Sequence, residues 1–129
     1  MGYAIPAAIG AKMADEKRQV VAVCGDGGFQ MSMMEFATMK EEGVDIKVVV
    51  LKNNYLGLVR EYQHYSLNDR YEMVKLGTYP RLSDLARAYD IDYYLADGME
   101  GLEEKIKDFL SAKNQAIMEV TVDANDTVK

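Results

Sequence analysis

Two short apolar runs rich in β-branched residues, at 19–24 and 46–51, are the clearest pattern in the chain. Runs of this length and composition predict buried strands. Residues 31–42 between them are interpreted as a helix, so the segment forms a strand–helix–strand unit. Such a crossover joins parallel strands and is right-handed in nearly all proteins. The residues that follow each strand therefore emerge at the same edge of one sheet, the carboxyl edge.

The rest of the chain continues this alternation of helices and strands. Pro6 favours the first turn of a helix that runs to about Ala14. The further predicted elements are a short helix at 56–63, an irregular stretch to Pro80, a helix at 82–89, a strand at 92–96, a helix at 99–112 with Asp97 as its N-cap, and a strand at 116–122. These strands are too apolar for an exposed face. They predict an α/β fold, in which a three-layer parallel sheet carries helices on both faces.

Composition and charge narrow the class of protein. The 129 residues, 49% of them hydrophobic and 28% charged, fit one globular domain, and no linker or repeat divides residues 1–129. The net charge of −6 and the lack of a basic patch argue against nucleic acid and anionic membranes as partners. Cys24 is the only cysteine, which excludes an internal disulfide framework and fits the reducing cytoplasm. Its place in an apolar strand predicts a buried, unreactive thiol.

Polar residues follow both of the first two predicted strands. Gly-Asp-Gly-Gly at 25–28 comes directly after the first strand, and Asn-Asn at 53–54 ends the second. Side-chain oxygens of Asp26 and Asn53 suit a hard cation such as magnesium or calcium. The glycines allow backbone N–H groups to approach a phosphate at the start of the next helix. A plain Asp-Gly turn is the alternative for Asp26 alone. Together, the two clusters predict a metal–diphosphate site at the carboxyl edge.

The spacing of these clusters resembles the thiamine diphosphate motif, Gly-Asp-Gly followed at a distance by Asn-Asn. The blocks at 1–12, 25–31 and 53–59, and the tail at 116–123, resemble the carboxyl-terminal region of acetolactate (acetohydroxyacid) synthase large subunits. This resemblance covers nearly the whole chain and is densest over residues 1–62. Many members of the family carry Ser where this chain has Gly28, so one hydroxyl is lost here while the backbone donor is kept.

The resemblance also implies a role for each site residue. Magnesium is bound by the side-chain oxygens of Asp26 and Asn53 and by the backbone carbonyl of Tyr55. Cofactor contacts are implied for Met1, as an apolar wedge beneath the folded cofactor, and for Gly25, Gly27, Gly28, Leu56, Gly57 and Leu58. Tyr62 occupies a position that is often Trp in the family and is assigned to the second substrate, with half-buried packing as the alternative. No catalytic residue is assigned, since His64 has no partner placed in the sequence to orient it.

The function that the resemblance implies is that of an acetolactate synthase, a transferase of branched-chain amino acid biosynthesis. It condenses pyruvate with a second 2-keto acid, with loss of carbon dioxide. The implied cofactors are thiamine diphosphate and magnesium, with FAD, where used, bound outside this domain. The implied partners are the pyrimidine-binding domain of a partner subunit, within a homodimer or tetramer, and a regulatory small subunit. Met1 is then internal to a longer chain, so the domain is N-terminally truncated and inactive alone.

Alternatives from two classes stay open at this stage. Other thiamine diphosphate enzymes share the motif, among them pyruvate oxidase, 2-keto-acid decarboxylases and glyoxylate carboligase. A non-catalytic binding domain with a Rossmann-like sheet is the second class. A dinucleotide enzyme is disfavoured, because no G-x-G-x-x-G follows a strand.

Overall fold

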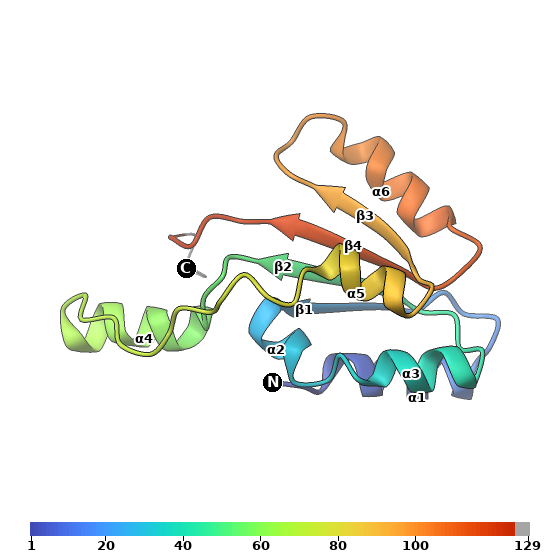
Figure 1. Ribbon diagram of the computed structural model, residues 1–129, viewed down its shortest axis with the longest axis horizontal. Helices are drawn as coiled ribbons and strands as arrows, with labels where there is room; N and C mark the ends of the chain where they lie inside the picture. Colours follow the sequence, from blue (N-terminus) through green and yellow to red (C-terminus); the bar gives the residue numbers. More distant parts are fainter. Residues whose placement is uncertain (126–129) are drawn as a thin grey trace.

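The computed structural model describes residues 1–125, and within them four strands form one sheet in which all neighbours are parallel. The order across the sheet is β1 (Val21–Gly25), β2 (Lys47–Lys52), β4 (Ala116–Thr121) and β3 (Asp92–Ala96). The carboxyl ends of these strands lie at one edge (Figure 1). The predicted parallel sheet is confirmed, and the polar residues after β1 and β2 do emerge side by side.

Helices cover both faces of the sheet, as the apolar strands predicted. One face carries α1 (Ala4–Ala14), α2 (Asp26–Gln30), α3 (Glu35–Glu41) and α5 (Leu82–Ala88), and the other carries α6 (Leu102–Ser111) over β3 and β4.

The larger core lies under α1, α2, α3 and α5. Phe29, Phe36 and Met39 from the helices pack there against Val48 and Val50 of β2, and all five are essentially inaccessible to water. Fully burying an apolar side chain of this size contributes about 1.5–3 kcal/mol. A smaller core, centred on Phe109 and Met118, joins α6 to the sheet. These cores hold the carboxyl edge in place.

The connection from β1 to β2 differs from the predicted helix at 31–42. A short helix, α2, already begins at Asp26, and α3 begins only at Glu35. Gly25 has an extended backbone (φ −77°, ψ 161°) and acts as the N-cap of α2. The carboxylate of Asp26 then lies at the positive end of the helix dipole, which favours helix formation there. The glycine segment is therefore the first turn of a helix rather than a loop.

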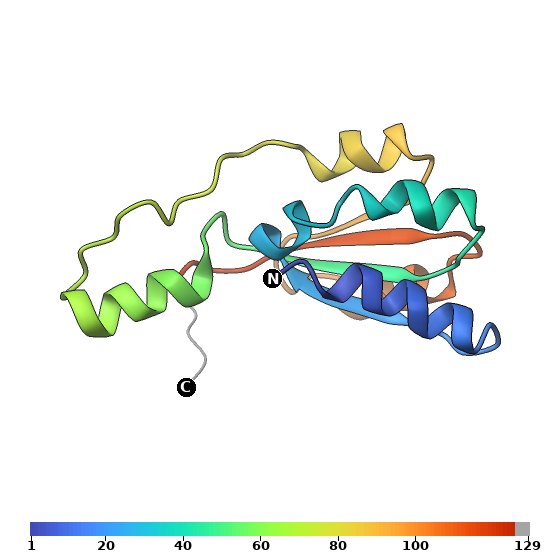
Figure 2. The same ribbon diagram turned by 90° about the horizontal axis from the view of Figure 1, so that it is seen from below.

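Two other helices also differ from their predicted limits. α4 (Gly57–Leu67) runs further than the predicted 56–63 and buries none of its residues. It lies beyond the carboxyl ends of the strands, and the chain returns beside it to α5 (Figures 1 and 2). The predicted N-cap of α6 at Asp97 is wrong, because Gly101 takes that position with a left-handed φ of 64°. Among the described residues no helix combines the length and the apolar character needed to cross a bilayer.

Candidate functional site

Asp26 is the most constrained polar residue at the carboxyl edge. It is 5% exposed. Its Oδ1 accepts the backbone N–H of Gly27 at 2.9 Å, and its Oδ2 accepts that of Asn54 at 2.7 Å. Burial raises the pKa of the Asp26 carboxyl, against the lowering effect of these bonds and of the Lys52 charge. A bound cation stabilises a buried carboxylate of this kind, because a nearby positive charge favours the ionised form.

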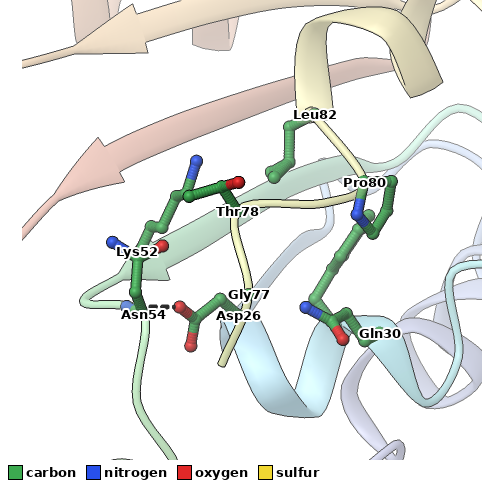
Figure 3. A pocket seen from close by; sticks show the side chains of 9 residues that line it. Asp26, Gln30, Lys52, Asn54, Gly77, Thr78, Pro80 and Leu82 are labelled. Carbon is green, nitrogen blue, oxygen red and sulfur yellow. Dashed lines mark hydrogen bonds between the residues drawn. The ribbon is translucent and has the colours of Figure 1, made fainter. Parts of the chain in front are cut away.

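The two asparagines of the Asn-Asn pair have different roles. Oδ1 of Asn53 accepts the N–H of Tyr55 at 2.9 Å, which closes a tight turn. Asn54 has a positive φ of 60°, a conformation that asparagine tolerates better than most residues. The backbone N–H of Asn54 orients Asp26. Asn54 also lines a small cavity, together with Asp26 and Lys52 (Figure 3). A second, larger cavity lies beside Asp26. Of the two asparagines, Asn53 lines this larger cavity and Asn54 does not.

That larger cavity lies at the carboxyl edge and has a volume of about 590 Å³, within the usual range for cofactor sites. Its lining contains every residue that the sequence assigned to the cofactor or to the metal: Met1, Gly25, Asp26, Gly27, Gly28, Asn53, Tyr55, Leu56, Gly57 and Leu58. Parts of the chain that are far apart in sequence therefore meet around one space.

Sequence reasoning missed the contribution of the segment after the last strand. Val122 and Asp123 also line the cavity. They follow β4, whose carboxyl end lies at the same edge as those of β1 and β2. A signal was present, since any residue that directly follows a strand of a parallel sheet reaches this edge.

Gly27 allows the turn after β1 to approach the segment after β2. A Cβ at this position would lie 2.7 Å from Cδ2 of Leu56 and 3.4 Å from Cε of Met1. Real Cβ atoms essentially never come as close as the first of these distances. A side chain at this position would therefore force Leu56 to move, and glycine allows the packing seen here without that shift.

Three further predictions concerned residues at or near this edge. Tyr62 is 65% exposed on α4 and is not among the cavity-lining residues, so its assignment to the second substrate stays a prediction. The expectation that His64 lacks an orienting partner is wrong, because its Nδ1 contacts Oδ1 of Asp69, which also accepts the Tyr71 hydroxyl at 2.6 Å. The predicted burial of Cys24 is wrong in part, because the residue is half-buried and lines the larger cavity. Desolvation still raises the pKa of its thiol to about 11, which agrees with the predicted low reactivity.

The donor set fits a magnesium-bound diphosphate. The Asp26 carboxylate, the Asn53 amide oxygen and the Tyr55 carbonyl are hard oxygen donors of the kind that magnesium prefers. Asp26 and Asn53 follow adjacent strands and line the same cavity. Phosphate oxygens and water would then complete the octahedral shell that magnesium requires.

The fold and the site define the class of protein. The chain belongs to the thiamine pyrophosphate enzymes, because the family model for the thiamine pyrophosphate enzyme, C-terminal TPP binding domain, matches residues 1–120. The resemblance inferred from the motifs is thereby confirmed.

Within this class, the chain is similar to acetolactate synthases. It is 39% identical over 124 residues to the acetolactate synthase of Arthrospira platensis and 35% identical over 128 residues to the large subunit of Lactococcus lactis. It is also 31% identical over 128 residues to the isozyme 2 large subunit of Escherichia coli. These matches cover 95–99% of this chain but only 21–23% of the relatives, so the chain spans about a fifth of their length. They favour this interpretation over the other thiamine diphosphate enzymes.

Proposed function

We propose that these residues form the diphosphate- and magnesium-binding domain of a longer, thiamine diphosphate-dependent acetolactate synthase. The cavity that gathers Asp26, Asn53 and the glycine turn carries this proposal, in a chain whose relatives are named acetolactate synthases. The full-length enzyme, a transferase, condenses pyruvate with a second 2-keto acid and releases carbon dioxide, in branched-chain amino acid biosynthesis.

In this proposal the chain binds and orients the cofactor. Asp26, Asn53 and the carbonyl of Tyr55 hold magnesium, and the backbone of Gly27 and Gly28 faces the diphosphate. Met1 packs beneath the cofactor, where it already lies against Gly27. Thiamine diphosphate, when bound, supplies the electron sink for decarboxylation. Leu56, Leu58 and Val59 give one side of the cavity an apolar lining.

A domain that continues beyond residues 1–129 is supported by the open edge of β1. The connection from β1 to β2 runs through α3, and that from β2 to β3 runs through α5, on the same face. α1 lies on that face too, so a right-handed connection through α1 places a preceding parallel strand beside β1, away from β2. On the other face, Val21 and Val23 of β1 are 41% and 57% exposed. In the full-length protein, a further strand pairs with the open edge of β1, and a helix next to that strand covers Val21 and Val23.

In this proposal, the pyrimidine-binding domain of a second subunit closes the cavity. That domain carries the glutamate that completes the site, so the enzyme is a homodimer or tetramer. FAD, where used, binds outside these residues. Two relatives are named large subunits, which supports a regulatory small subunit. The free thiol of Cys24 fits the reducing cytoplasm.

The full-length protein tests the proposal directly. Isothermal titration with thiamine diphosphate, with and without magnesium, should show magnesium-dependent binding. Incubation with pyruvate should then yield acetolactate. No binding under either condition would favour a non-catalytic domain. Free acetaldehyde in place of acetolactate would identify a decarboxylase.

A further inference from the structure

A largely buried ion pair joins the last residue of β2, near Asp26, to the middle of β4. Nζ of Lys52 donates to Oε1 of Glu119 at 2.7 Å, and the hydroxyl of Tyr93 donates to Oε2 of the same carboxylate at 2.9 Å. The side chains of Lys52 and Glu119 are 21% and 11% exposed. The three residues come from β2, β4 and β3, so this network joins three adjacent strands.

Stability alone does not explain this network. Removing an ammonium and a carboxylate from water costs free energy that their mutual attraction often fails to exceed. Replacing such a pair by well-packed apolar residues of similar volume frequently leaves the stability of a protein unchanged or raises it. What apolar packing lacks is direction, because the hydrophobic effect is non-directional, whereas each hydrogen bond fixes a donor relative to an acceptor.

The place that the network fixes is the end of β2. Lys52 is the last residue of that strand and directly precedes Asn53. Its own carbonyl accepts the N–H of Val122, so both its backbone and its side chain bind the β4 segment. Lys52 and Asp26 also line the same small cavity (Figure 3). A shift of the Lys52 backbone would displace the turn that carries Asn53 and the N–H of Asn54 that holds Asp26.

We propose that Lys52 is a positioning residue for the metal site, and that its bonded contact with Glu119 and Tyr93 fixes Asn53 relative to Asp26. This inference rests on the proposed function, since it concerns the same magnesium. Lys52 contacts neither metal nor substrate. It acts through the two residues that do.

The first variants are Lys52→Met and Lys52→Arg in the full-length protein. Loss of residues that orient metal ligands typically weakens metal binding about 10–100-fold. We expect Lys52→Met to raise the half-saturating magnesium concentration at least about tenfold, measured by titration at saturating thiamine diphosphate. kcat at saturating magnesium should stay within about twofold. Lys52→Arg keeps a cation for Glu119 and should restore most of the affinity.

A triple variant separates positioning from stability. Lys52→Met combined with Tyr93→Phe and Glu119→Leu replaces the network by apolar groups and leaves no carboxylate unpaired. Its thermal unfolding midpoint should equal or exceed that of Lys52→Met alone, while its magnesium affinity stays low. This variant also keeps the test informative where Lys52→Met alone does not fold.

The matched control is Lys107→Met, which removes an exposed pair with Glu103 on α6. It should leave magnesium binding unchanged. Parental magnesium affinity in the triple variant, or an equal loss in Lys107→Met, would overturn the inference. Failure of the parent itself to bind magnesium and cofactor would instead overturn the proposed function, so the two failures are distinguishable.

Discussion

Replacing Asp26 by Asn perturbs the site at its most constrained residue. Each carboxylate oxygen accepts one backbone N–H, from Gly27 and from Asn54. An Asn side chain has one acceptor oxygen, so its NH₂ group would face one of these donors. A hydrogen bond to a charged acceptor contributes ~1.5–3 kcal/mol. Loss of the buried charge offsets part of this, so we expect the metal-free variant to lose ~1–2 kcal/mol of stability.

The effect on magnesium should be larger than the effect on folding. Residues that only orient a metal ligand change affinity about 10–100-fold. Loss of an anionic ligand should exceed the upper end of this range, which corresponds to more than about 2.7 kcal/mol. Titration calorimetry with magnesium at saturating thiamine diphosphate measures the affinity, and thermal unfolding without metal measures the stability. Asn53→Ala should act in the same direction.

A matched control lies in the next residue. Asn54 orients Asp26 through its backbone, and glycine keeps that N–H and tolerates the positive φ. Asn54→Gly should therefore bind magnesium within about twofold of the parent, a difference of no more than about 0.4 kcal/mol. Parental affinity in Asp26→Asn would refute the reasoning. So would a loss in Asn54→Gly as large as that in Asn53→Ala.

Four further outcomes are expected. Tyr62→Trp should change the ratio of acetohydroxybutyrate to acetolactate formed from mixed 2-keto acids, by an amount equivalent to ~1–3 kcal/mol in substrate discrimination. An unchanged ratio would show that Tyr62 does not contact the second substrate. The 129 residues expressed alone should form no acetolactate above a no-protein control, because the proposed site also needs a glutamate from another domain. Phe36→Ala, at a fully buried ring, should lower the free energy of unfolding in urea by ~3–5 kcal/mol, and a loss near zero would contradict its place in the core. Hydrogen bonds from Tyr71 and His64 hold the pKa of Asp69 below its usual 3.8. The ionised Asp69 carboxylate therefore stabilises the folded chain above pH 3.8, and this contribution is lost as the pH falls through the lower pKa of the folded state. After correction for the intrinsic exchange rate at each pH, the protection of the amides after α4 should fall on acidification, but not in Asp69→Asn.

The parallel sheet and the converging site were predictable because both follow from local patterns. The apolar runs at β1 and β2 marked the strands, and parallel pairing then placed Asp26 and Asn53 at one edge. The start of α2 at Asp26 was not predictable from propensity, because glycine disfavours helices. The helix forms there because the carboxylate stabilises its first turn and Phe29 is buried in the core.

Contacts between residues far apart in the sequence explain what the sequence did not show. Lys52 and Glu119 are separated by 67 positions, and Tyr93 and Glu119 by 26. No periodicity in one sequence encodes such pairs. The separate roles of Asn53 and Asn54 were hidden for a different reason, since identical side chains differ here only in backbone angle and in the cavity that they face.

The absence of buried residues in α4 has a practical consequence. Substitutions at exposed positions away from special features usually change stability by less than about 0.5 kcal/mol. α4 begins at the rim of the cavity with Gly57 and Leu58 and continues to Tyr62 without contributing to either core. Substitutions along this helix are therefore expected to change the stability of the sheet little, so positions such as Tyr62 can be varied to test the proposed substrate contact without unfolding the domain.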